Sequence, residues 1–531
     1  MSQAKATDHE STLNTSPTRW RVSLFRRLCV AAQLIATLRK PDFQAAGSYV
    51  GARYADRSFV VRWVRFLGWA LRQTFMVIPG TADDLTIDKR VSRTPIWLTD
   101  DNPLANFPWR DLASADVALP GEIDTLVIGA GFTGAACAYH WSRRAPSDRG
   151  RGLVVVEMDD PASGSSGRNE GLVVMGRYFD YVRKTVLGHL PAVRADLSDA
   201  QRGQLALQFA RKYCSAAYRN ADLIEKTIRD EDFDCDYARA GWVQARDQAE
   251  QAVLASSVQI AQEEHFVDWT SISPDEVLER SGMRVSYNAG FSKAAASWHP
   301  AKWVWCLLTK ALASPNVQLF TRTRVGRVED AGEHYNVYTD RGVIRARHVV
   351  CATEAYTPKL HAKFHDTILP MQEQAACGDG GPATMKPHIG ISGAWWFGGR
   401  YGKRVLFGSG GSRLPDHEAG RNRPSRFLSR WVGTEMKRLF GSYQLNMTNE
   451  WSGTVGYTPD EYPIVGAFDG KRQYIVAGMC GSGSSVSFNG ARCVCNRILG
   501  LPDETDDYPP AYFAPSRLLD PHGHDWPELE A

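Results

Sequence analysis

The sequence is poor in paired cysteines, in long apolar runs and in charge of one sign. Its ten cysteines are scattered without a CxxC pair, so we expect no metal site and no disulfide framework, and a reducing compartment is favoured. The apolar run at residues 28–38 is too short for a bilayer, which takes roughly 20 apolar residues, and no export signal is evident. The net charge of +3 lacks the concentrated basic excess of a nucleic-acid binder. We therefore predict a cytoplasmic protein that binds no nucleic acid.

One stretch of the chain carries the strongest pattern. Residues 125–128 are a short apolar run that predicts a buried strand, and glycines in GxGxxG spacing and a helix rich in small residues follow it. In a dinucleotide site, Gly129 permits the tight turn, Gly131 lets the backbone approach a pyrophosphate, and Gly134 lets helix and strand pack closely. The pyrophosphate then lies on free N–H groups at the positive end of the helix.

A second apolar run, residues 153–156, predicts the next strand and is followed by Glu157. An acid at this place accepts hydrogen bonds from a ribose. A GxGxxG alone is weak evidence, and the alternative is a glycine-rich loop with a fortuitous acid. The strand before the turn, the helix after it and the acid beyond them favour a dinucleotide site.

The loop that follows distinguishes a flavin from a nicotinamide. Residues 164–171 read GSSGRNEG, which resembles the turn close to GASGRNGG in the D-amino-acid oxidase-like (DAO) superfamily of FAD-dependent oxidoreductases. The resemblance is nearest to its glutamylputrescine oxidase, sarcosine oxidase and glycine oxidase branches. In that superfamily the turn passes along the flavin, which implies flavin contacts by Ser166, Arg168 and Asn169 and a place for Arg168 beside the reaction. The alternative for Arg168 is a solvated loop cation.

The resemblance continues near the C-terminal end of the chain. The residues that match the family pattern Thr-x-Asp-x-x-Pro-x-x-Gly are Thr458, Asp460, Pro463 and Gly466. A glycine-bearing turn at 478–483 then precedes a helix expected over 484–499. A helix N-terminus aimed at the isoalloxazine would stabilise the negative charge of reduced flavin. The flavin contacts that the resemblance implies here are Asp460, Gly481, Gly483 and Ser484.

Two positions depart from the sarcosine-oxidase branch. Where that branch tethers its flavin to a cysteine, this chain has Gly453, so we expect FAD to be bound non-covalently. Where it places a lysine for a substrate carboxylate, this chain has Ser485. A simple sarcosine-like substrate is therefore not favoured, although Arg177 or another cation could replace the lysine.

Two strands in the middle of the chain extend the resemblance. A strand expected over 317–328 matches one that contacts the adenine half of FAD in related oxidases, which implies Val325. The buried run at 349–353 ends in Ala-Thr, like the superfamily's second dinucleotide-domain signature, which implies Ala352. The FAD domain is therefore expected to be built from separated pieces of chain.

His299 is the histidine that we select as a catalytic candidate. His299-Pro300 opens an apolar-striped helix over 303–312, as in the related oxidases. The histidine could contact the substrate or act as an acid or base near the flavin. The alternative is a structural role, which is the commoner one for a single histidine.

Residues 366–448 alternate in the manner of half-exposed antiparallel strands. We expect 389–397 and 404–408 to pair across a turn at 398–402. This pairing would gather aromatic residues into a wall that attracts an apolar or cationic amine. The alternative is that these side chains are ordinary core. The residues of the expected wall are Trp395, Trp396, Phe397 and Tyr401, and Trp396 and Tyr401 are our candidates for substrate contact.

The N-terminal region is of a different character. Residues 1–18 are polar and expected to be disordered. Two basic, aromatic, amphipathic helices are expected at about 24–38 and 58–77. Residues 19–77 could dock on an anionic membrane surface or on another subunit. The alternative is that the helices pack on the catalytic body.

We therefore predict an α/β fold with a Rossmann-like FAD-binding domain, a mixed, mainly antiparallel substrate domain and an N-terminal helical extension. The expected parts are a tail at 1–18, the extension and linker at 19–107, FAD-domain segments at 108–240, 316–365 and 449–500, a helical part of the substrate domain at 241–315, its sheet at 366–448, and a C-terminal tail at 501–531.

The predicted function is the oxidation of a C–N bond in an amine or N-substituted amino acid by hydride transfer to FAD, with oxygen or another electron acceptor. One alternative is a dehydrogenase that passes electrons to a quinone or a protein partner. A second alternative is a non-catalytic flavoprotein subunit of a complex.

Overall fold

A computed structural model describes residues 57–76, 91–108, 117–145, 151–175, 178–265, 269–393, 396–409, 419–420, 424, 436–441, 443, 445–468, 472–503 and 505–529. The expectations for the tail at 1–18, the helix at 24–38, Arg177 and Trp395 fall outside these residues. The chain divides into two units, residues 1–90 with 424–438 and residues 91–423 with 439–531.

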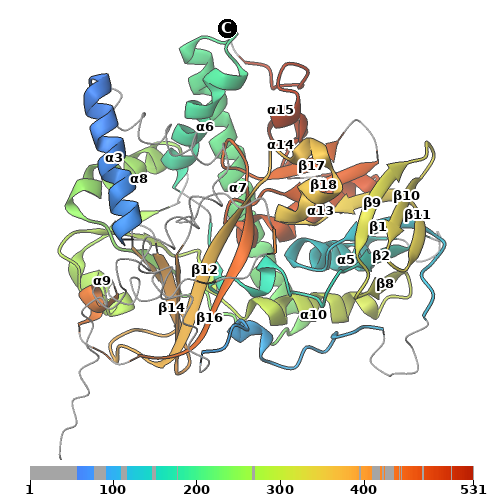
Figure 1. Cartoon of the computed structure of the whole chain (residues 1–531), viewed down its shortest axis with the longest axis horizontal. Helices are drawn as coiled ribbons and strands as arrows, with labels where there is room; N and C mark the ends of the chain where they lie inside the picture. The colour runs from blue at the N-terminus through green and yellow to red at the C-terminus, as the bar shows by residue number, and fades with distance from the viewer. Residues whose placement is uncertain are drawn as a thin grey trace, which may run out of the picture. The chain divides into compact units, whose positions relative to one another are not determined.

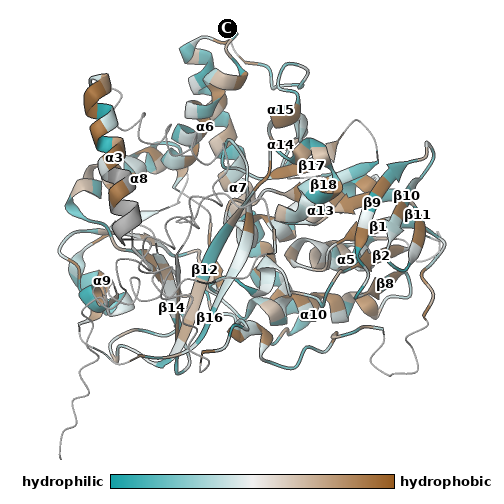
Figure 2. Ribbon diagram, in the orientation of Figure 1, coloured by the Kyte–Doolittle hydropathy of each residue, from teal (hydrophilic) through white to brown (hydrophobic). Residues whose placement is uncertain are grey.

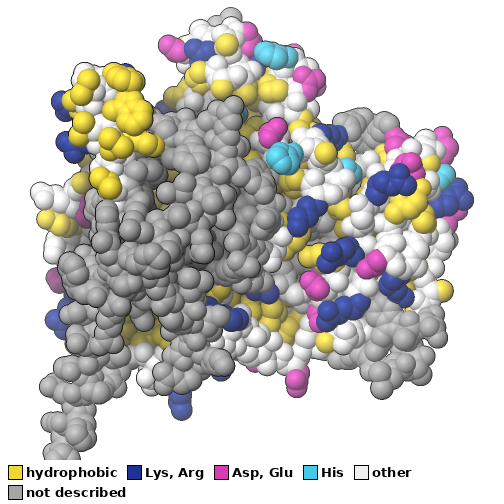
Figure 3. Space-filling model, viewed as in Figure 1, with side chains coloured by type: hydrophobic (Ala, Val, Ile, Leu, Met, Phe, Trp, Pro, Cys, Tyr) yellow, Lys and Arg dark blue, Asp and Glu magenta, His cyan; other side chains and the backbone are white. Residues whose placement is uncertain are grey.

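In the first unit, helix α3 spans Phe59–Met76, which confirms the helix expected at 58–77. Its large apolar side chains are exposed, among them Val60 and Val64 at 69% and 63%. These residues are four apart and therefore share one face. Figure 2 shows the apolar character of this ribbon, and Figure 3 shows apolar side chains gathered on it. Among the helices that the structure describes, none is long and apolar enough to cross a membrane.

The second unit contains a largely parallel sheet with the strand order β17-β18-β11-β1-β2-β8. Strand β1 pairs in parallel with β11 and β2, and β17 is antiparallel to β18. The last four residues of β1 and all of β2 are buried, as expected of strands covered on both faces. The bounds are β1 Glu122–Ile128, β2 Leu153–Val156, β8 Val317–Phe320, β11 Gly342–Cys351, β17 Ile464–Phe468 and β18 Gln473–Ala477.

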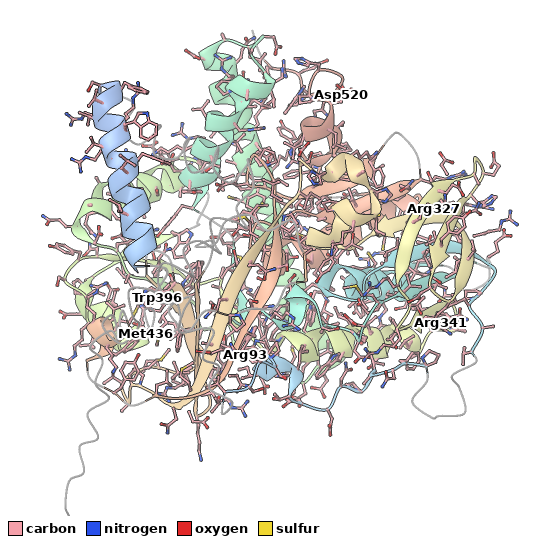
Figure 4. All side chains as sticks on the ribbon, in the orientation of Figure 1. Arg93, Arg327, Arg341, Trp396, Met436 and Asp520 are labelled. Atoms are coloured by element: carbon pink, nitrogen blue, oxygen red, sulfur yellow. The ribbon has the colours of Figure 1, made fainter. Side chains whose placement is uncertain are left out.

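Strands β8 and β9 correct one expectation from the sequence. The single strand expected over 317–328 is two strands, β8 and β9 (Val325–Asp330). The chain breaks between them because Arg322 has a left-handed φ of 50°. Strand β10 (Tyr335–Thr339) pairs with β9 and with the first half of β11 (Figure 1). Arg327 and Arg341, labelled in Figure 4, lie in this part of the molecule.

Three helices lie beside this sheet. Helix α5 (Phe132–Arg144) packs against α10 (Pro300–Leu312) and α13 (Gly483–Leu499), as Figure 1 shows. The contact face of α5 is small because it contains Ala135, Ala136 and Ala138 at 0% exposure, so the three helices can approach closely. The helices expected over 303–312 and 484–499 are thereby confirmed.

The other sheet of the second unit has the order β16-β12-β15-β14-β13-β4-β6-β5. All its neighbours are antiparallel except β13 and β4, which confirms a mixed, mainly antiparallel sheet. The bounds are β4 Trp242–Gln244, β5 Thr270–Ile272, β6 Ala289–Ser292, β12 Leu369–Gly380, β13 Gly390–Ser392, β14 Trp396–Tyr401, β15 Arg404–Ser409 and β16 Leu445–Tyr457.

The turn expected at 398–402 is wrong. Residues 398–401 belong to β14, and Tyr401 pairs with Arg404 across a two-residue turn. Gly402 supplies the positive φ of 59°, which tight hairpin turns of this kind require. The one strand expected at 389–397 is likewise two, β13 and the start of β14, which form their own antiparallel pair.

Longer helices and short strands complete the second unit. The longest helix, α7, begins with a capping box between Ser198 and Gln201, in which each residue satisfies a backbone N–H of the other. The remaining bounds are α6 Phe179–Val193, α7 Asp199–Glu231, α8 Gln251–Glu263, α9 Pro274–Ser281, α11 Thr357–Leu360, β3 Leu172–Val173 and β7 Ala296–Ser297.

The segment after α13 belongs to the core. Helices α14 (Pro510–Phe513) and α15 (Ser516–Leu519) bring Phe513 and Arg517 to 0% and 1% exposure. Arg517 donates to Asp460, with Nε 2.8 Å from Oδ2. This buried ion pair fastens the segment to the loop before β17.

Candidate functional site

The second unit contains a cavity of about 1140 Å³, above the roughly 300–1,000 Å³ usual for small-molecule sites. Its wall includes residues from all three glycine-bearing turns of the sequence, at 129–131, 163–170 and 479–484. The third turn, which follows the first two by more than 300 residues along the chain, therefore meets them at one cavity. Its size suits a large cofactor together with a substrate.

The first turn joins β1 to α5. Gly129 has a φ of +104°, and a Cβ there would lie 2.7 Å from the carbonyl oxygen of Ala352. A Cβ on Gly134 would collide with the backbone of Gly129. Side chains are thus excluded from both places, and the N-terminus of α5 is left open toward the cavity.

The second turn crosses the N-terminus of α5. The Phe132 N–H donates to Ser166 Oγ at 2.8 Å, and a Cβ on Gly131 would lie 2.7 Å from the same oxygen. Ser166 therefore occupies the place at which the helix end attracts negative charge. The absent Cβ of Gly131 keeps this place accessible.

Glu157 follows β2 and lies in the cavity wall. Its Oε2 accepts the Ala130 N–H at 2.7 Å, and its Oε1 accepts the Asp159 N–H at 3.0 Å. Burial raises the pKa of this carboxyl. The two bonds fix the carboxylate, and each oxygen retains acceptor capacity for a ribose hydroxyl.

Arg168 and Asn169 form the end of the second turn and both line the cavity. Arg168 Nε donates to the Ser163 carbonyl at 2.8 Å, and burial lowers the pKa of its guanidinium. Asn169 donates to the carbonyls of Ser165 and Ser166 and accepts the Gly171 N–H. Asn169 thus holds the turn together, while Arg168 places a cation in the wall.

Glu354 holds the third turn and was not found from the sequence. Its carboxylate accepts the Met479 N–H at 2.8 Å and the Gly456 N–H at 2.9 Å. Burial raises its pKa to about 8. The residue has a left-handed φ of 46°. It ties the end of β11 to β16 and to the turn before α13.

Part of the cavity wall is aromatic. Trp242 packs against Trp269 with ring centroids 4.9 Å apart and against Phe397 at 5.7 Å. Tyr178 lies 4.5 Å from Trp269. All four residues line the cavity. Phe397 was in the expected wall, but the other three come from segments whose neighbours depend on the sheet order.

Besides Gly134, four of the predicted site residues lie outside the cavity wall. Trp396, labelled in Figure 4, is 1% exposed in β14 and belongs to the core. Tyr401 donates to the carbonyls of Glu170 and Gly171. His299 caps α10 by accepting the Lys302 N–H. Asp460 is paired with Arg517, as described above. Each of these four side chains is taken up by the protein, and none of them lines the cavity.

The remaining predicted FAD contacts surround the cavity. Gly134 does so indirectly, by permitting the close approach of α5. Those that line it are Gly129, Gly131, Glu157, Ser166, Arg168, Asn169, Val325, Ala352, Gly481, Gly483 and Ser484. A flavin dinucleotide needs helix N-termini, backbone turns free of Cβ atoms and a fixed acid. The cavity has two such helix N-termini, the turns and the acid, so its residues fit FAD.

The family of FAD-dependent oxidoreductases named DAO matches residues 124–497. The chain belongs to this family, and FAD is its cofactor. The fold class expected from the sequence is confirmed.

Individual proteins show more distant likeness. The bifunctional protein MnmC of Maricaulis maris (strain MCS10), named for tRNA 5-methylaminomethyl-2-thiouridine biosynthesis, is 26% identical over 360 residues. This alignment covers 66% of the present chain and 48% of MnmC, so the chain spans about half the length of that relative.

Two solved structures have the same fold. Glycine oxidase from Geobacillus kaustophilus has a TM-score of 0.57 at 17% identity, over 74% of this chain and 98% of its own. L-Proline dehydrogenase from P. horikoshii has a TM-score of 0.57 at 19% identity, over 75% of this chain and 98% of its own.

Proposed function

We propose that the protein oxidises a C–N bond of an amine or N-substituted amino acid to an imine, which then hydrolyses in water. The observation that carries this proposal is one cavity lined by two unlike groups of residues. One group, which we call the nucleotide end, consists of glycine turns and helix N-termini, and the other, the substrate end, of aromatic rings and carboxyl groups. A substrate held at the second end would lie next to the cofactor held at the first.

FAD, when bound, supplies the hydride acceptor, so the protein needs no dedicated oxidant of its own. The N-terminus of α5 and Ser166 would hold its phosphates, and Glu157 its ribose. The N-terminus of α13 stabilises developing negative charge by about 0.3–2 kcal/mol. The aromatic rings exclude water and orient the substrate.

We further propose that the flavin is held non-covalently. Gly453 occupies the position of the tethering cysteine in the sarcosine-oxidase branch. Cys480 does line the cavity, but burial raises the pKa of its thiol to about 12. A thiol of that pKa is protonated at neutral pH and is a poor nucleophile. Acid precipitation should therefore release all the flavin into the supernatant.

Anaerobic mixing of the purified holoprotein with a panel of amines and amino acids tests the activity. Bleaching of the flavin by an amine or N-substituted amino acid supports the proposal. A flavin that none of them bleaches contradicts it and favours the non-catalytic subunit. Reoxidation of the bleached flavin by oxygen or by a quinone analogue then separates an oxidase from a dehydrogenase.

For the N-terminal arm we propose docking of residues 19–77 on a membrane surface or a subunit. The exposed apolar face of α3 supports it, and α3 carries Arg62 and Arg65 but no acid. Replacing Phe59, Trp63 and Leu67 by serine should abolish co-sedimentation with anionic vesicles or shift the oligomeric state. Unchanged behaviour in both assays contradicts the proposal.

A further inference from the structure

Aromatic side chains hold the backbone of the second turn from outside the cavity. The Nε1–H of Trp451 donates to the Arg168 carbonyl at 2.9 Å, and the Nε1–H of Trp97 donates to the Asn169 carbonyl at 2.8 Å. Both rings are buried, at 0% and 4% exposure, and neither lines the cavity. Since a donor lies near the lone-pair direction of the oxygen that accepts from it, both carbonyl oxygens are directed into the protein.

Tyr401 holds the next two carbonyls of the turn. Its hydroxyl oxygen lies 2.8 Å from the carbonyl oxygens of both Glu170 and Gly171, so its one hydrogen is shared between them. Burial raises the pKa of Tyr401 well above its usual value, and the hydroxyl therefore keeps this hydrogen. Tyr401 does not line the cavity either. Three side chains from distant segments thus hold four consecutive carbonyls.

The peptide between Glu170 and Gly171 is the one most able to turn over. Gly171 has a φ of +70°, and glycine populates positive and negative φ about equally, so it tolerates either orientation. Two hydrogen bonds select the observed one: the Gly171 N–H donates to Asn169 Oδ1 at 2.8 Å, and Tyr401 donates to the Glu170 carbonyl. The Gly171 carbonyl has a second donor in the Trp298 N–H at 3.0 Å.

The donors also support one another. The rings of Trp97 and Tyr401 meet edge to face, with centroids 5.1 Å apart. A Cβ on Gly171 would lie 2.6 Å from the Trp97 ring, so the glycine lets this ring reach the turn. Packed rings have little freedom to follow the turn, and the orientation of the carbonyls is therefore fixed by the protein.

This orientation matters because Arg168, Asn169 and Glu170 all line the cavity. A carbonyl oxygen is the negative end of the peptide dipole, so an oxygen turned into the cavity would disfavour the negative charge that flavin gains on reduction. Burial raises the pKa of the Glu170 carboxyl to about 8. This carboxyl is therefore mostly protonated at neutral pH and does not outweigh the backbone dipoles.

We propose that Tyr401, Trp97 and Trp451 are positioning residues for FAD, which raise its reduction potential by keeping the carbonyl oxygens of residues 168–171 out of the cavity. They act through the turn and not by touching the cofactor. The inference rests on FAD as the cofactor of the family. It does not depend on the substrate class or on the oxidation of an amine.

Tyr401→Phe tests this role, because it removes the hydroxyl and keeps the ring. The full chain with bound FAD is reduced slowly at neutral pH together with a dye of known potential, and the absorbance spectra of dye and flavin give the reduction potential. We expect the ratio of reduced to oxidised flavin at a fixed potential to fall about tenfold, a shift of about 30 mV for a two-electron couple. The flavin should stay bound, because the residues that line the cavity are unchanged.

Tyr512→Phe is the matched control. The Tyr512 hydroxyl also donates one hydrogen bond, to Gln208 Oε1 at 2.8 Å, and the side chain is 7% exposed and outside the cavity wall. This variant should have the potential of the unaltered protein. Trp97→Phe removes the donor to the Asn169 carbonyl and should shift the potential in the same direction as Tyr401→Phe. It decides the question if Tyr401→Phe does not fold.

The inference is overturned if Tyr401→Phe and Trp97→Phe keep the potential of the unaltered protein, if the potential rises, or if the control shifts by as much. A merely structural role of Tyr401 would lower the urea midpoint of unfolding and leave the potential of the bound flavin unchanged. A potential that falls in Tyr401→Phe but not in Tyr512→Phe upholds the inference, whether or not amines bleach the flavin.

Discussion

The two ends of the cavity are built in opposite ways. At the nucleotide end the wall consists of glycine-bearing turns at the N-termini of α5 and α13, and the glycines of each turn are within a few residues of one another. At the substrate end the wall consists of side chains, and Glu170, Glu373 and Trp242 come from three distant segments. Each turn of the first end is a local property of the chain, although the three turns meet only in the fold, whereas the second end has no local unit and exists only once the sheets have formed.

The largest effect should come from breaking the nucleotide end alone. In Gly131→Leu the new side chain collides with Ser166 and covers the N-terminus of α5, so flavin retention should be lost. The ratio of flavin to protein absorbance measures it. Gly203→Ala is the control, since Gly203 lies outside the cavity wall and no atom lies within 4 Å of a Cβ there. Equal flavin content in both variants would refute the assignment of this end.

A smaller effect is expected at the substrate end. Glu170 has its pKa raised from 4.5 to about 8, so it stabilises the fold only while protonated. Its contribution is complete below pH 4.5 and is lost as the pH rises through 8. The variant Glu170→Gln has no titrating carboxyl at this position, so it should not lose this part of the free energy of unfolding as the pH rises.

At pH 9 the ligand-free variant should therefore be more stable than the unaltered protein, by on the order of a few kcal/mol. Urea unfolding at pH 5 and pH 9 measures the difference. Glu354 also has a raised pKa, so the free energy of unfolding of the variant should still fall in part between pH 5 and pH 9. A variant that loses stability at pH 9 contradicts an unpaired carboxyl.

The next prediction concerns Glu354, which lines the cavity and holds the third turn. The variant is Glu354→Gln. An amide has one oxygen for the two N–H groups of Gly456 and Met479, so one buried donor should lose its partner, at a cost of about 1–3 kcal/mol. Unfolding by urea should show this loss, and flavin should dissociate more readily. An unchanged unfolding midpoint together with unchanged flavin affinity would show that Glu354 does not hold the third turn.

The smallest effect should follow from removing one aromatic ring from the cavity wall. Phe397→Leu keeps an apolar side chain but removes a ring face, so the affinity for a cationic amine should fall by about 3–10-fold. The flavin content should stay the same. Substrate titration under anaerobic conditions gives both values, and a loss of flavin would show that the two ends are not separable.

The sequence predicted those parts of the site that are formed by residues close to one another along the chain. The turn at 129–134, the acid after β2 and the helix after the third turn follow from neighbouring residues. The substrate end could not be predicted because residues next to one another in space are placed there by strand order. Trp242 reaches Phe397 because β4 pairs with β13 and β13 with β14. His299 and Tyr401 were chosen because their residue types suit chemistry, while their bonds to backbone groups and their place outside the cavity wall are visible only in the fold.

The order of strands in the parallel sheet has a consequence for synthesis. Strand β1 leaves the ribosome long before its partner β11, and β18 follows only after the entire antiparallel sheet. Until then, the nascent chain presents the unpaired edge of β1, and later that of β11, to its surroundings. Such edges are targets for chaperones and sites of aggregation. Soluble yield during expression should therefore depend on translation speed and temperature.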